Sequence, residues 1–259
     1  MPANSFLTEF RKVLAGIEST QLEAIRTAAS WVADAVAVER FGVLFGSGHS
    51  FIPTMDTFPR IGSFPAWLPI HELSTSYMVN ILGNQGLRQS LFLEKVEGFG
   101  RLILENYRLD PRDVMIVISN SGVNAMGIDV ALCAKEQGLK TVAITSLAHS
   151  QSSPSRHSSG QRLFEVCDLV IDSCVPQGDA LVTVPAYPHK VASASTIASS
   201  IIMQSIAAET AYQLADRGII LPVYPSHNAR MSPEEHDAIE QMADAVLAEY
   251  ARRTTGIHK

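Results

Sequence analysis

The sequence predicts an α/β fold in which a mostly parallel, five-stranded sheet is covered by helices on both faces. Short and nearly uninterrupted apolar runs alternate along the chain with longer segments of helical periodicity. This alternation is typical of parallel strands joined by helical crossovers, because such strands are buried on both faces. The 259 residues are 46% apolar, which is enough for a large core. We therefore expect a three-layer αβα sandwich.

Two helices are expected at the beginning of the chain, over residues 4–38. Leu22 and Ile25 begin an apolar series at helical spacing. The stretch Thr20–Glu23 has the spacing of a capping box, in which two side chains satisfy the free amides at a helix start.

The strands are expected where apolar runs end in polar or glycine-containing segments. They cover residues 41–45, 67–71, 113–118, 141–145 and 168–172. The helices that follow are expected at residues 90–107, 125–137, 192–216 and 233–252. We expect a single domain over residues 1–259, with its core at about 35–215, N-terminal helices at 4–38 and a C-terminal helical extension at 230–252.

Composition restricts the function. The net charge of −6 and the pI of about 5.7 argue against nucleic-acid binding, which needs a basic surface. The sequence has no run of about 20 apolar residues, as a membrane span would need, and no apolar signal segment at its start. Three cysteines without close spacing are expected to be reduced thiols. These features predict a soluble, cytoplasmic protein that binds neither membranes nor nucleic acids.

The first candidate binding element is the segment Ser119–Asn124, which reads SNSGVN and follows a predicted strand. In parallel sheets, ligands bind beyond the carboxyl ends of the strands. The helix that follows offers unpaired amides and a positive dipole end, which suit a phosphate. Further hydrogen bonds can be donated by the side chains of Ser119, Asn120, Ser121 and Asn124. The alternative is that these residues only cap the helix.

A second segment, Gly46–Ser50, reads GSGHS and follows the first predicted strand. It fails the dinucleotide pattern G-x-G-x-x-G, because Phe51 occupies the third glycine position. Glu72 lies where a ribose-binding acid could stand, so dinucleotide binding remains an alternative. Both candidate segments end a buried strand in small hydroxyl residues, and this shared chemistry favours a different ligand.

Together these two segments resemble the sugar isomerase, or SIS, domain family over about residues 35–215. Its first strand ends in a G-x-G-x-S loop, matched by Gly46–Ser50, and its third in S-x-S-G-x-T, matched by Ser119–Asn124. The resemblance implies a flavodoxin-like αβα sandwich and a phosphosugar ligand, with the phosphate held by Ser50, Ser119 and Ser121. Asn124 replaces the usual threonine. The chain is more similar to standalone phosphosugar isomerases of this family than to two-domain aminosugar synthases.

The remaining phosphate-site candidates come from the same loops and from two later segments. They are Gly48, His49 and Asn120 in the loops, His157 in the polar loop 146–160, and Lys190 and Ser193 near the start of the long helix. His149 and Arg156 could also close over a substrate. Simple surface exposure or helix capping would explain the later residues equally well.

Sugar-phosphate isomerisation needs a base close to C1 and C2. Glu72 is our candidate base because it directly follows a predicted strand, with His71 beside it. The alternatives are that Glu72 caps the next turn and that His71 packs in the fold. Glu209 is a further candidate, because a carboxylate on an apolar helix is costly without a role or a partner. The histidine spacing matches no compact metal site, so we expect neither a metal nor a cofactor.

Three functions remain open on the sequence. The first is a phosphosugar isomerase, the second a lyase or etherase acting on a phosphosugar, and the third a non-catalytic phosphosugar sensor. Sensors of this family are usually joined to a helix-turn-helix segment, but residues 1–38 contain no basic recognition helix. An enzyme is therefore favoured. The apolar helix at residues 192–216 and the amphipathic N-terminal helices further predict a homodimer or a higher homo-oligomer.

Overall fold

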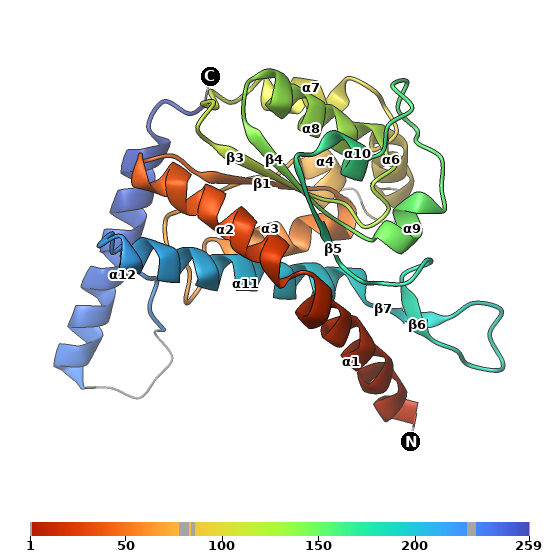
Figure 1. Cartoon of the computed structure of the whole chain (residues 1–259). Helices are drawn as coiled ribbons and strands as arrows, with labels where there is room; N and C mark the ends of the chain where they lie inside the picture. The colour runs from red at the N-terminus through yellow and green to blue at the C-terminus, as the bar shows by residue number, and fades with distance from the viewer. Residues whose placement is uncertain (1, 78–82, 84–85, 227–231, 259) are drawn as a thin grey trace.

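A five-stranded sheet forms the centre of the molecule, and every neighbouring pair of its strands is parallel (Figure 1). Its strand order is β2-β1-β3-β4-β5. The strands are β1 (Gly42–Gly46), β2 (Trp67–Ile70), β3 (Val114–Ile118), β4 (Lys140–Thr145) and β5 (Leu169–Asp172). The computed structural model describes residues 2–77, 83, 86–226 and 232–258.

Helices cover both faces of this sheet. The longer ones are α1 (Pro2–Thr20), α2 (Leu22–Ala37), α6 (Gly86–Leu93), α8 (Ala125–Glu136), α11 (Ser195–Asp216) and α12 (Pro233–Thr254). The shorter ones are η1 (Gly48–Phe51), α3 (Ile52–Thr57), α4 (Leu73–Ser76), α7 (Phe99–Leu104), α9 (Leu147–Gln151) and α10 (Leu163–Val166). α2 and α11 pack on one face, and α7, α8 and α10 pack on the other.

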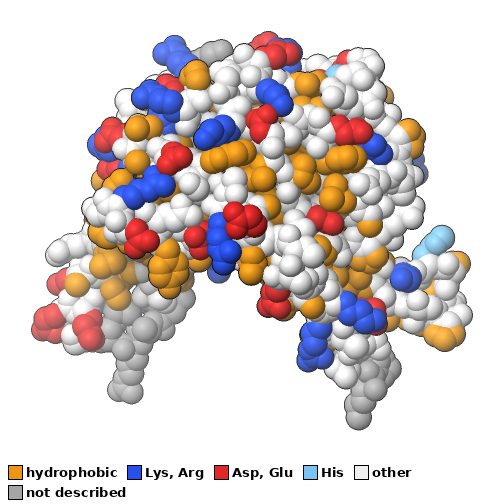
Figure 2. Space-filling model, in the orientation of Figure 1, with side chains coloured by type: hydrophobic (Ala, Val, Ile, Leu, Met, Phe, Trp, Pro, Cys, Tyr) orange, Lys and Arg blue, Asp and Glu red, His pale blue; other side chains and the backbone are white. Residues whose placement is uncertain are grey.

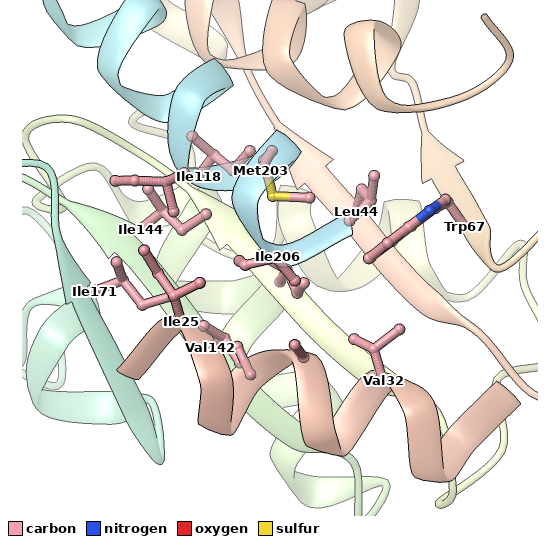
Figure 3. Close-up of a cluster of buried hydrophobic side chains, with 14 of the residues drawn as sticks. Ile25, Val32, Leu44, Trp67, Ile118, Val142, Ile144, Ile171, Met203 and Ile206 are labelled. Carbon is pink, nitrogen blue, oxygen red and sulfur yellow. The ribbon is translucent and has the colours of Figure 1, made fainter. Parts of the chain in front are cut away.

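The strands are largely apolar because each face of the sheet is packed against helices, and the central strands β1 and β3 are buried at every residue. Leu44 of β1 joins the core on the side of α2 and α11, whereas its neighbours Val43 and Phe45 join the core on the side of α7 and α8. Figure 3 shows the first of these clusters, where Ile25 of α2 and Ile206 of α11 approach the strand side chains. Two cores on opposite faces of one sheet give the expected three layers.

The five predicted strands are confirmed to within one or two residues. The single helix predicted at residues 90–107 is wrong, because α6 and α7 are separated by a turn in which Gly98 has a φ of 89°. The capping box at Thr20–Glu23 is also wrong. The Thr20 hydroxyl donates to the carbonyl of Gly16, and the N-cap of α2 is Gln21, whose side chain makes no capping bond.

The long helix begins three residues later than predicted, because residues 191–193 form a strand. β6 (Ala180–Val182) and β7 (Val191–Ser193) make an antiparallel hairpin outside the main sheet. In Figure 1 this hairpin and α1 extend together away from the sheet.

Figure 2, which has the orientation of Figure 1, shows acidic and basic side chains interspersed over this side of the molecule. Within the described residues, no helix combines the length and apolarity that a membrane crossing requires.

One buried carboxylate ties together the beginnings of β1 and β3. The Asp113 side chain, which is fully buried, accepts hydrogen bonds from Arg40 Nε at 3.0 Å and Nη2 at 2.6 Å. It also accepts from the backbone amides of Phe41 at 2.9 Å and Asp110 at 2.8 Å. These four bonds hold the two strands side by side at the edge of the sheet opposite their carboxyl ends.

We predict that Asp113→Ala destabilises the protein by about 3–5 kcal/mol, because it leaves Arg40 and two amides without their acceptor in a buried place. Glu136→Ala is a suitable control, since the pair of Arg101 with Glu136 is about half exposed and should contribute less than about 1 kcal/mol. Urea denaturation measures both. Equal losses in the two variants would contradict this role of Asp113.

Candidate functional site

The direction in which the chain builds the sheet reverses between β1 and β3. The chain passes from β1 to β2 on one side and later reaches β3 on the other side of β1. Ligands of open α/β sheets bind at such a reversal, beyond the carboxyl ends of the strands. Gly46 at the end of β1 is paired with Ile118 at the end of β3. The two loops singled out in the sequence therefore leave the sheet next to each other.

The loop after β1 depends on glycine. A Cβ atom at Gly46 would lie 2.1 Å from the carbonyl oxygen of Ser50, because η1 folds back over the strand end. Gly48 has a φ of 55°, in the left-handed region that favours glycine. His49 is exposed and Ser50 is half-buried at this loop. The two glycines of the G-x-G-x-S pattern are thus required by the tight turn itself.

The loop after β3 is also tightly folded. The Ser119 hydroxyl accepts a hydrogen bond from the amide of Gly122 at 3.2 Å. The carbonyl of Asn120 accepts from the amide of Ser146 at 3.0 Å, which fixes the loop to the end of β4. Gly122 has a φ of 60°, and a Cβ there would lie 2.9 Å from the hydroxyls of both Thr145 and Ser150.

Several polar groups of this region have no protein partner. Within the described residues, the hydroxyls of Ser50 and Ser121 make no hydrogen bond. The buried Ser150 hydroxyl and the buried Oδ1 atom of Asn120 are also unsatisfied. Buried polar atoms are normally paired with protein, water or ligand. The strand-end loops therefore have unused hydrogen-bonding capacity.

Asn124 occupies the N-cap position of α8 but makes no capping hydrogen bond with its side chain. Its Nδ2 donates to Glu94 Oε2 at 3.0 Å, and its Oδ1 accepts from Arg156 Nη1 at 2.6 Å. Only this orientation of the amide satisfies both neighbours, since the carboxylate can only accept and the guanidinium can only donate. Asn124 therefore links three segments of the chain and is not simply a helix cap.

Glu94, which the sequence analysis did not single out, lies between the two loops. Its Oε1 accepts from the Ser47 hydroxyl at 2.8 Å and its Oε2 accepts from Asn124. Its backbone carbonyl accepts from the amide of Met126 in the first turn of α8 at 3.1 Å. The residue is only 9% exposed. A carboxylate with each oxygen oriented by one donor is thus fixed between the two loops, and lone pairs remain for a ligand.

A signal for Glu94 exists in the sequence, although it is weak. Gly98 and Gly100 follow Glu94 closely, and two glycines in a predicted helix indicate a break. A break at these glycines is consistent with a turn at Glu94 instead of a helix. Periodicity alone could not show that this turn lies beside the β1 loop, because that contact spans 47 residues of sequence.

The structure places Glu72 and His71 at the end of β2, one strand away from the β1–β3 reversal. Glu72 is the N-cap of α4, and its Oε1 accepts from the amide of Ser74 at 3.1 Å and from its hydroxyl at 2.6 Å. His71 Nε2 is 3.1 Å from the Thr54 hydroxyl, and its ring packs edge-on against Phe51. Burial lowers the pKa of His71, so the imidazole is neutral at pH 7.

The other predicted residues lie on or near α11. Glu209 is 14 residues beyond Ser195, roughly 21 Å along the helix at 1.5 Å per residue, and accepts a hydrogen bond from Gln213. The start of α11 already has an anion, since Asp179 accepts from the amides of Ala194 and Ser195 at 3.0 and 2.7 Å. The structure thus brings together the two strand-end loops but not these later candidates.

Lys190 and Ser193 lie in the hairpin region instead of at the helix start. Ser193 is the last residue of β7 and is exposed. Lys190 lines a hollow of about 530 Å³ between α1 and β6, together with Glu9. Neither residue shares a described contact with the strand-end loops.

Both histidines of the polar loop 146–160 contact other segments of the chain. His149 Nδ1 accepts from the amide of Gly178 at 3.4 Å, close to the distance limit of a hydrogen bond. The side chain of His157 is only 8% exposed, and its Nε2 lies 3.2 Å from Asp129 Oδ1. Among the described residues, no group of three or more histidine, cysteine or acidic side chains could hold a metal ion.

Comparison with known proteins identifies the family of the chain. The model of the SIS domain family matches residues 5–146, more than half of the chain and all of β1 to β4. The chain is 35% identical over 234 residues to a UPF0309 protein of Geobacillus kaustophilus, a match that covers 90% of each chain. It is 37% identical over 206 residues to a UPF0309 protein of Shouchella clausii, covering 80% of this chain and 82% of that one.

A solved structure shares the fold. The phosphoheptose isomerase of Neisseria gonorrhoeae superposes with a TM-score of 0.53 at 14% identity, over 80% of this chain and 95% of that one. The family model, the close relatives and the shared fold lead to one assignment: the chain belongs to the SIS domain family and is one of its UPF0309 members.

Proposed function

We propose that this protein binds a phosphorylated sugar and interconverts its aldose and ketose forms. One observation carries the proposal: two loops with unpaired hydroxyls flank a fixed carboxylate at the β1–β3 reversal. The isomerase structure that shares this fold adds support for the class of ligand. In this proposal, the two loops bind the phosphate of the sugar and the carboxylate transfers the proton.

The phosphate would lie between Ser50 of the β1 loop and Ser119 and Ser121 of the β3 loop. The hydroxyls of Ser50 and Ser121 have no other partner among the described residues and can donate to phosphate oxygens. The N-terminus of α8 adds the positive end of its helix dipole, which favours an anion at this point. A phosphate held here fixes where the carbon atoms of the sugar lie.

Glu94 is our candidate for the proton-transferring base. The reaction removes the proton from C2 of the aldose and returns a proton to C1, while the proton of the C2 hydroxyl moves to the C1 oxygen, so nothing is consumed. One carboxylate can take the proton from C2 and deliver it to C1. Glu94 is fixed beside both loops, whereas Glu72 is engaged as a helix cap and Glu209 lies far along α11. Glu72 remains the second candidate, because it follows a strand of the same sheet.

For binding, we predict that Ser121→Ala weakens phosphosugar affinity about 10-fold or more. The variant loses one hydrogen bond to a charged group, worth about 1.5–3 kcal/mol. Ser19→Ala, which alters an exposed residue of α1, is the control and should bind normally. A panel of aldose and ketose phosphates is screened by thermal shift, and calorimetry then gives the affinities. Unchanged affinity in a folded Ser121→Ala protein would remove this loop from the site.

For catalysis, we predict that Glu94→Gln lowers turnover by about 10²–10⁴-fold and leaves phosphosugar binding nearly intact. The glutamine amide can still pair with both neighbours, because the Ser47 hydroxyl can accept as well as donate. Proton NMR in deuterated water detects turnover and deuterium incorporation at C1 of the ketose and, through the reverse reaction, at C2 of the aldose. Glu72→Gln is the matched control and should retain both.

Two results would overturn this assignment. If Glu72→Gln loses exchange and Glu94→Gln keeps it, the base is Glu72. If the wild-type protein incorporates no deuterium into any sugar phosphate that it binds, proton-transfer isomerisation fails. Product analysis then distinguishes a lyase or etherase from a sensor that releases the sugar unchanged.

A further inference from the structure

Residues 152–162, which we call the strap, lie along the outer side of the β3 loop. The amide of Arg156 donates to the carbonyl of Val123 at 2.9 Å. The amide of Leu163, directly after the strap, donates to the carbonyl of Gly122 at 2.8 Å. Two main-chain hydrogen bonds therefore place the strap against the segment that is proposed to hold the phosphate.

Arg156 is the cation that the strap brings to this place. Its Nη1 donates to Asn124, whose amide also donates to Glu94. Arg156 is exposed and forms no ion pair within the described residues, whereas Arg162 at the other end of the strap is paired with Glu165. The guanidinium thus keeps donors free for another anion.

The two loops themselves contain neither lysine nor arginine. A phosphate bound there would meet hydroxyls, amides and a helix dipole, but no positive side chain from either loop. The carboxylate of Glu94 lies between the same loops and disfavours a second negative charge. A guanidinium at Asn124 would offset that repulsion, and its planar fork suits phosphate oxygens.

A buried anchor holds the strap immediately beyond Arg156. The inward-facing His157 contacts Asp129 through Nε2 and lies 3.6 Å from Glu97 Oε1. Asp129 is itself nearly buried, and its Oδ2 accepts from the amide of Gly98 at 2.7 Å. The amide of Ser158 donates to Glu97 at 2.8 Å. A guanidinium carried by an anchored backbone loses less conformational freedom when it binds.

We propose that Arg156 is a specificity residue for the anionic group of the substrate, and that His157 and Asp129 are its positioning residues. This inference rests on the proposed function and names the contact that selects phosphorylated over unphosphorylated sugars. His157 then acts through Arg156 and does not touch the phosphate itself.

The test is calorimetric titration with inorganic phosphate and with the members of the sugar-phosphate panel that bind the wild-type protein. Arg156→Gln should weaken both by about 10-fold to 100-fold, the loss typical of a hydrogen bond to a charged group. Arg156→Lys should recover part of the affinity, because the charge remains while the fork is lost. Arg26→Gln makes the same change of net charge on α2 and should bind as the wild type does.

The positioning role has its own readout. Asp129→Asn should weaken phosphate binding in the wild-type background and have no further effect in the Arg156→Gln background, because the two residues act through one contact. Additive losses in the double variant would overturn the positioning role. Normal affinity in Arg156→Gln would overturn the assignment of Arg156 alone. Failure of the wild-type protein to bind phosphate or any sugar phosphate would overturn the proposed function as well.

Discussion

The parallel pairing of β1 with β3 is the constraint on which the site depends. Gly46 and Ile118 are partners at the ends of these strands, so both loops begin at the same level of the sheet. The crossovers then leave in opposite directions, and ligands of open α/β sheets bind beside such a reversal. At the other end of the same strands, Asp113 joins the beginnings of β1 and β3. The positions of the loop hydroxyls and of Glu94 therefore follow from two strands held in one register.

Chemical roles are divided among segments that are distant in sequence. The loops after β1 and β3 supply neutral donors, the turn after α6 supplies a carboxylate, and the strap supplies a cation. A continuous series of hydrogen bonds runs from Ser47 through Glu94 and Asn124 to Arg156. The carboxylate, the amide and the guanidinium are therefore members of one polar network.

The fold could be predicted from sequence because its signals are local. A strand buried on both faces must be largely apolar, and β1 and β3 in the middle of the sheet are buried at every residue. The glycine–serine loops could be found for the same reason, since the turns at Gly46 and Gly122 tolerate no side chain. Glu94, Asp129 and the role of Arg156 could not be predicted. Their partners lie about 30 or more residues away, and only the packing of α6, α8 and the strap brings them together. Glu72 shows the opposite case. Its capping of the next turn is a local interaction with Ser74, and the sequence offers this capping role as an alternative.

The central claim is that the loops after β1 and β3 hold the phosphate of a sugar. A crystal structure of the protein with a sugar phosphate from the binding panel tests it most directly. We expect the phosphate within hydrogen-bond distance of Ser50, Ser119 and Ser121, with the sugar extending toward Glu94. A phosphate bound elsewhere, for example in the hollow between α1 and β6 that Lys190 lines, would contradict the account.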